Sequence, residues 1–201
     1  MGNLRYVPAG MFTQGSPESE IGRSVGEGPQ FQHTLTKNLA VMETEVTRQM
    51  WADLRAAQSS LPADPTDTRY GSGMNNPVQN VTWYEAVFFA NLLSQQRGLQ
   101  RVYYADSSFT VPIGSANYQT DAVYANWSAD GYRLPTEGEW EYFTRAGSTS
   151  PFSILEPAYN SSTWDNCSTA LSALDSVAWY WCNSQSRFAS APAGTKASNP
   201  W

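Results

Sequence analysis

Residues 131–147, with the sequence GYRLPTEGEWEYFTRAG, constrain the local fold of this chain more than any other stretch. Pro135 disfavours a helical conformation at the residue before it, so a helix can begin only after this point. Thr136 and Glu139 have the spacing of a capping box, in which each side chain satisfies a free N–H group at the helix start. The glycine at the end of the motif supplies a left-handed residue beyond the last turn. The segment therefore predicts a helix over 137–146.

Glu137, Glu139 and Glu141 place carboxylates in or near the first turn of that predicted helix. Carboxylates gathered in one site can serve as acid–base groups. Near a helix N-terminus, however, negative charge stabilises the helix dipole without any catalytic role. We therefore expect these side chains to stabilise the helix, and we assign them no catalytic function.

Two further helix starts precede this one in the chain. Thr47 is followed by apolar residues at helical spacing, which predicts a helix over 48–58. Thr82 and Glu85 repeat the capping-box spacing and open a second helix over 83–97. This second helix is apolar over much of its circumference, so we expect it to lie at the centre of the core.

The rest of the chain is rich in turn residues and predicts short strands only. Eight Trp, eleven Tyr and eight Phe occur against 15% charged residues, which favours a loop-rich domain with an aromatic core. No internal repeat or linker is visible, so we expect a single α+β domain over 1–201. The expected strands lie at 4–7, within 6–16 after a Pro/Gly turn, and at 34–41, 101–104, 123–125 and 177–181.

Charge and hydropathy exclude several partners and locations. The net charge of −6 argues against a nucleic-acid partner, since phosphate binding requires clustered Lys and Arg. No stretch approaches the roughly 20 apolar residues of a membrane-spanning helix. Residues 1–3 lead directly into the first expected strand, which leaves no room for a signal peptide. A cytoplasmic location and a leader missing from this chain both remain open, and the Lys-poor, Ser/Asn-rich composition favours an extracytoplasmic or secreted protein.

Several motifs along the chain are similar, in the same order, to those of one known family. They are YVPAGMFTQGS (6–16), QHTL (32–35), EVT (45–47), NPVQNVTWYEA (76–86), GYRLPTEGEWEYFTRAG (131–147), AWY (178–180), GTK (194–196) and NPW (199–201). The chain resembles the formylglycine-generating enzyme family, also called the sulfatase-modifying factor family. The resemblance implies its α+β fold, a variant of the C-type-lectin-like fold with little regular secondary structure.

The chain departs from the family pattern in three places. Gly138 replaces an expected Ala, which costs about 1 kcal/mol of helix propensity. Residues 143–144 are Phe-Thr where the family has a small Ala-Ala pair, so local packing must differ. The chain stops at Trp201, whereas the family continues to an Arg-Gly-Gly-Ser stretch and a catalytic cysteine pair. The resemblance therefore implies a member that is incomplete at its C-terminus and inactive alone.

Two functions on this scaffold follow from the resemblance. The full-length parent would be an oxidoreductase that converts a cysteine of a sulfatase-type protein or peptide to formylglycine, with copper(I) and oxygen. The alternative is a non-catalytic domain of the variable-protein type that binds a protein or small ligand. Fold alone cannot separate the two. Two closely spaced cysteines in downstream sequence would favour the oxidase.

Cys167 and Cys182 are the only cysteines of the chain. A local disulfide, two buried thiols and a metal site are all open for them. Soft thiolates select copper(I), and the family binds that ion through two cysteines. Those family cysteines lie beyond the end of this chain, so the resemblance does not assign their role to this pair.

His33 and Asn183 are the remaining candidate site residues. His33 is the only histidine, so no multi-histidine iron or zinc site can form, and a role on a strand face is expected. The lone histidine also argues against the ergothioneine-type sulfoxide synthases that share this fold. Asn183 lies where the resemblance implies structural calcium ligands, and oxygen-rich loops suit that ion. An asparagine that holds a turn is the alternative. No catalytic or cofactor-binding residue is assigned.

Overall fold

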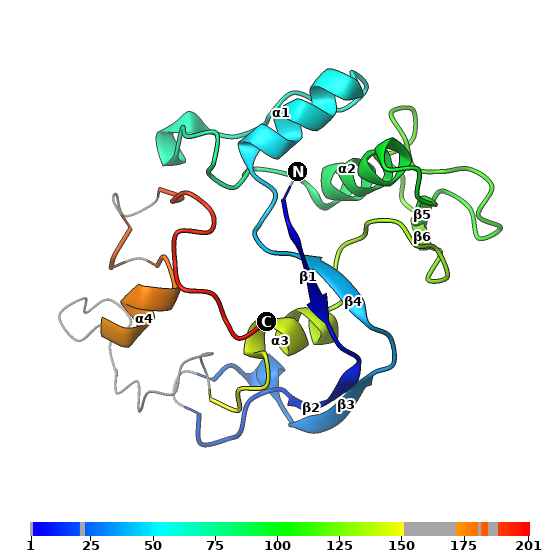
Figure 1. Cartoon of the computed structure of the whole chain (residues 1–201). Helices are drawn as coiled ribbons and strands as arrows, with labels where there is room; N and C mark the ends of the chain where they lie inside the picture. The colour runs from blue at the N-terminus through cyan, green and yellow to red at the C-terminus, as the bar shows by residue number, and fades with distance from the viewer. Residues whose placement is uncertain (1, 21–22, 151–171, 181, 185–188) are drawn as a thin grey trace. The chain divides into compact units, whose positions relative to one another are not determined.

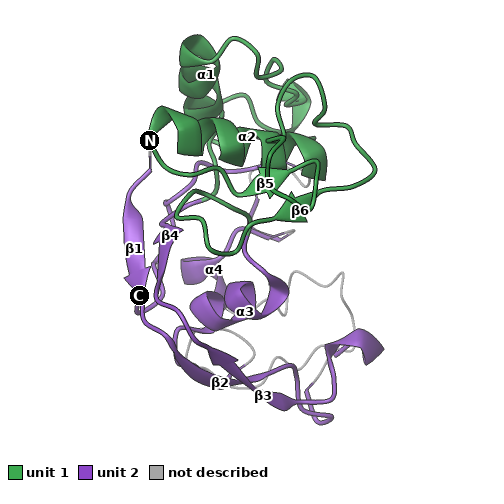
Figure 2. Ribbon diagram, turned by 90° about the vertical axis from the view of Figure 1, so that its right-hand side faces the viewer, with its two compact units in different colours: residues 1, 45–134 green, residues 2–44, 135–201 purple. Residues whose placement is uncertain are grey.

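The computed structural model of the chain describes residues 2–20, 23–150, 172–180, 182–184 and 189–201 (Figure 1). The chain divides into two compact units (Figure 2). Unit 1 contains Glu45–Leu134, and unit 2 contains Gly2–Thr44 and Pro135–Trp201. Such units occur within single domains as well as between domains, so the single domain over 1–201 stays a prediction.

Unit 1 is built around two helices and very little sheet. Its elements are α1 (Arg48–Ala57), the 3-10 helix η2 (Thr68–Tyr70), α2 (Trp83–Gln96), β5 (Tyr103–Tyr104) and β6 (Tyr124–Ala125). Both predicted helices are confirmed: Thr47 accepts from the Met50 N–H at the start of α1, and the Thr82–Glu85 capping box is present at the start of α2. The two short strands pair antiparallel, and they are shorter than their sequence predicted.

The core of unit 1 surrounds α2, as its apolar circumference predicted. Every residue from Val87 to Ser94 is buried. Phe89 stacks on Trp51 of α1 with ring centroids 5.1 Å apart. Asn91 is the polar exception inside this core at 1% exposure, and its hydrogen bonds are described below. Helix α2 is therefore the element on which the rest of the unit is assembled.

The described residues of unit 2 form two separate two-stranded antiparallel sheets, two α-helices and one 3-10 helix. Its elements are β1 (Leu4–Val7), β2 (Gly10–Gln14), the 3-10 helix η1 (Val25–Glu27), β3 (Phe31–Leu35), β4 (Leu39–Met42), α3 (Glu137–Arg145) and α4 (Ser172–Val177). Strand β1 pairs with β4, and β2 pairs with β3. Its buried core consists of Val7, Leu35 and Tyr142, with the Trp201 ring packed 4.8 Å from the Tyr142 ring.

The single strand predicted over 34–41 is wrong. The chain forms β3 and β4 on either side of a turn, and each strand pairs with a different partner. Within that turn the Asn38 side chain accepts a hydrogen bond of 2.8 Å from the Ala9 N–H. Loose alternation continues through the turn, so the sequence pattern could not reveal the break.

The strand predicted over 177–181 is also wrong. The helix α4 runs to Val177, and the Ala178 N–H donates to the Leu174 carbonyl as the helix ends. The Asn183 side chain then bonds both the Tyr180 N–H and the Ala178 carbonyl. These local partners satisfy the backbone polar groups that a strand would have presented to a neighbour. Trp181 itself lies outside the described residues.

Candidate functional site

The motif at 131–147 forms α3, and two of its acidic residues, Glu139 and Glu141, have hydrogen-bond partners. Thr136 and Glu139 form the predicted capping box. The Glu141 carboxylate accepts from the Gly15 N–H at 2.9 Å and from the Arg145 guanidinium at 2.8 Å. Arg145 also donates to the Gly15 carbonyl, so this pair ties α3 to the end of β2. The helix ends at Arg145, one residue earlier than predicted.

His33 lies on β3 among aromatic rings and against α3. Its ring stacks with Phe12 at 5.7 Å and with Phe31 at 6.0 Å, and its Nδ1 lies 2.5 Å from the Gln14 carboxamide oxygen. A Cβ added at Gly138 would lie 2.3 Å from His33 Cε1. The glycine that departs from the family pattern therefore makes room for the histidine ring.

The described residues do not fit a copper(I) site. Cys182 is disulfide-bonded, so its sulfur cannot act as a thiolate ligand in this state. Cys167 lies outside the described residues. Within the described ranges, no group of three or more His, Cys, Asp or Glu side chains is placed to hold a metal ion.

Asn183 lies at the centre of a hydrogen-bonded segment after α4. Its Oδ1 accepts from the Tyr180 N–H at 2.8 Å, and its Nδ2 donates to Asp175 Oδ1 at 3.0 Å. The Tyr180 hydroxyl donates to the same carboxylate oxygen at 2.8 Å. Burial raises the pKa of Tyr180 to about 12, and the neighbouring Asp175 carboxylate acts in the same direction. The side-chain oxygens of Asn183 and Asp175 are of the type that ligate calcium. Calcium ligation by Asn183 stays a prediction.

Lys196 closes the same segment from the C-terminal side. Its ammonium group donates to the Asp175 backbone carbonyl and lies 3.8 Å from the centre of the Trp179 ring. The Trp179 indole N–H donates to the Thr195 hydroxyl at 2.9 Å. The AWY and GTK motifs of the family pattern therefore contact each other, which gives both a structural role.

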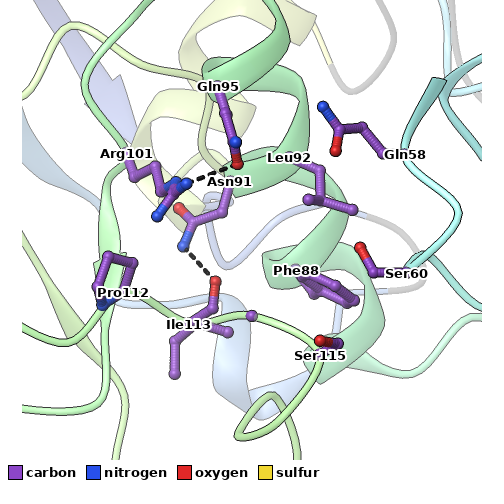
Figure 3. A pocket seen from close by; sticks show the side chains of 11 residues that line it. Gln58, Ser60, Phe88, Asn91, Leu92, Gln95, Arg101, Pro112, Ile113 and Ser115 are labelled. Carbon is purple, nitrogen blue, oxygen red and sulfur yellow. Dashed lines mark hydrogen bonds between the residues drawn. The ribbon is translucent and has the colours of Figure 1, made fainter.

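A pocket of about 260 Å3 lies within unit 1 and was missed by the sequence analysis (Figure 3). Phe88, Leu92 and Ile113 belong to its lining but are buried, and most of its other lining residues are polar. Arg101 and Gln95 lie together at its rim, joined by a hydrogen bond of 2.5 Å from the guanidinium to the carboxamide oxygen. The polar residues Asn91 and Gln95 on an otherwise apolar helix are a signal in the sequence that could have indicated it.

Asn91 holds the walls of this pocket together. Its Nδ2 donates to the carbonyls of Tyr103 and Ile113 at 2.7 and 3.0 Å (Figure 3 shows the second bond). Its Oδ1 accepts from the N–H groups of Val102 and Tyr103 at 3.2 and 3.0 Å. The amide is thus fully used in joining α2 to the segments around β5.

The comparison with known families gives one match over nearly the whole chain. The profile described as "Sulfatase-modifying factor enzyme 1-like domain" matches residues 3–201. Among curated proteins, the chain is 31% identical over 141 residues to the "Chaperone protein LppX" of Paenibacillus barcinonensis. That match covers 69% of this chain and 42% of the relative, so the chain spans less than half of the relative's length.

Solved structures with the same fold include proteins from two bacteria. The "Treponema denticola variable protein 1" has a TM-score of 0.69 at 24% identity, covering 98% of this chain and 66% of that one. PvdO from Pseudomonas aeruginosa has a TM-score of 0.65 at 24% identity, covering 98% and 64%. CarF has a TM-score of 0.53 at 26% identity, covering 73% and 58%.

These matches confirm the predicted fold class, an α+β fold of the formylglycine-generating type with little regular secondary structure. Among the described residues, no helix is both long and apolar enough to cross a lipid bilayer. Because the matching profile covers residues 3–201, the chain belongs to the sulfatase-modifying factor enzyme 1-like family.

Proposed function

We propose that residues 1–201 form a ligand-binding domain on the scaffold of this family and do not themselves oxidise cysteine. The observation that carries the proposal is the structural use of the candidate reactive groups. Cys182 is disulfide-bonded, the His33 ring is stacked with two phenylalanines, and Glu141 is paired with Arg145. An oxidase that works through copper(I) needs free thiolates, which Cys182 does not supply in this state.

The similarity to the chaperone protein LppX supports a binding role. LppX is described as a chaperone, a class of protein that binds other proteins rather than converting them. The chain spans only 42% of that relative, so a protein partner for this chain is part of the proposal. The other partner class on this scaffold is a small ligand.

The proposal is tested by an assay for cysteine oxidation. Residues 1–201 are incubated with copper(I), oxygen and a cysteine peptide of the sulfatase type, and aldehyde is measured by mass spectrometry. A competent formylglycine-generating enzyme provides the positive control. We expect no aldehyde from this chain. Aldehyde formation above the level found without the protein would overturn the proposal.

A second candidate is that these residues belong to a longer protein that oxidises cysteine. The match to a sulfatase-modifying factor profile favours it, as does the greater length of the relatives. In that case copper(I) would be held by cysteines beyond residue 201. The test is the natural gene: a longer reading frame with two closely spaced downstream cysteines supports the oxidase, and a frame without them contradicts it.

We further place the protein outside the cytoplasm. The disulfide at Cys182 supports this location, because such bonds persist in oxidising compartments. The natural protein is isolated freshly, without any thiol-blocking or reducing agent, and is then unfolded. Titration of its free thiols should find none. Fully reduced cysteines in freshly isolated protein would contradict the location.

A further inference from the structure

We draw no further inference here: the strongest candidate, the apolar and partly exposed outward face of the β1–β4 sheet formed by Leu4, Tyr6, Ala40 and Met42, carries nothing because the structure does not show what covers it.

Discussion

Helices α2 and α3 begin in the same way and end up in different surroundings. In α2 the Glu85 N–H donates to Thr82 Oγ1 at 3.2 Å, and in α3 the Glu139 N–H donates to Thr136 Oγ1 at the same distance. In both, the glutamate carboxylate accepts a hydrogen bond from the threonine N–H. Yet α2 is buried from Val87 to Ser94, whereas α3 buries only Gly138 and Tyr142.

A capping box therefore determines where a helix starts but not which residues cover it. Helix α2 is covered by other residues on most sides. A buried amide such as Asn91 is tolerated there because each of its polar atoms has a hydrogen-bond partner. Helix α3 leaves Trp140 57% exposed and is held instead by an ion pair and by close contact with one ring.

The largest effect is expected from Asn91→Leu in α2. The leucine fills the space but leaves the N–H groups of Val102 and Tyr103 buried without their acceptor. We expect a loss of about 3 kcal/mol or more in the free energy of unfolding. Urea denaturation followed by tryptophan fluorescence measures it. Gln96→Ala, at the exposed end of the same helix, should stay within about 0.5 kcal/mol. A loss below about 1 kcal/mol for Asn91→Leu would contradict the role given to this amide.

In α3 the corresponding sensitive position is Gly138. Alanine is favoured over glycine in a helix by about 1 kcal/mol. The added methyl group would nevertheless lie 2.3 Å from His33 Cε1, so we expect a net loss of about 1–3 kcal/mol.

A double-mutant cycle with His33→Ala tests the cause. When the ring is absent, Gly138→Ala should become neutral or stabilising. Gly26→Ala is the control in the same unit, because a Cβ there meets no atom within 4 Å. If Gly138→Ala costs the same with and without the His33 ring, close packing is not the reason for the glycine.

The shared feature of the two helices should give shared effects. Thr82→Ala and Thr136→Ala each remove a cap acceptor at an exposed helix start, and each should cost about 1 kcal/mol. Chemical denaturation of the two variants gives the comparison. Replacement by Ser should restore most of the loss in both. If the two losses in the free energy of unfolding differ by more than about 1 kcal/mol, the tertiary contacts around each helix also determine the energy of its cap.

The smallest effect is expected from Glu141→Gln. The Glu141–Arg145 pair has 18% exposure on each side and is therefore partly screened by solvent. The amide keeps an acceptor for the Gly15 N–H, so the loss should be about 0.5–1 kcal/mol and should shrink in 1 M salt. Glu137→Gln in the first turn should cost only a few tenths of a kcal/mol. A loss at Glu141 that does not respond to salt would contradict an electrostatic origin.

Helix starts were predictable because their signals are local. Thr47, Thr82 and Thr136 cap the helices that the sequence predicted, and each cap involves residues no more than three positions away. The strands at 34–41 and 177–181 were wrong because alternation carries no information about a pairing partner. The partner of a strand lies far along the chain, and its backbone is what makes the strand.

The candidate sites show the same difference between local and distant contacts. The turn-holding role that the sequence left open for Asn183 is seen in bonds to residues within eight positions of it, and its role as a calcium ligand stays a prediction. The pocket of unit 1 was missed because its lining comes from the end of α1, from α2 and from the segment at 101–115. The proximity of those segments is a result of packing.

Three features were predictable from the sequence: the family, the beginnings of α1, α2 and α3, and the central place of α2 in its core. These follow from short-range hydrogen bonds and from the total apolar surface of one helix, which are properties of contiguous residues. Three other features became visible in the folded chain: Asn91 joins three segments, Gly138 accommodates His33, and Arg101 lines a pocket. Each of these depends on which distant atom lies within a few ångströms, and packing alone settles that.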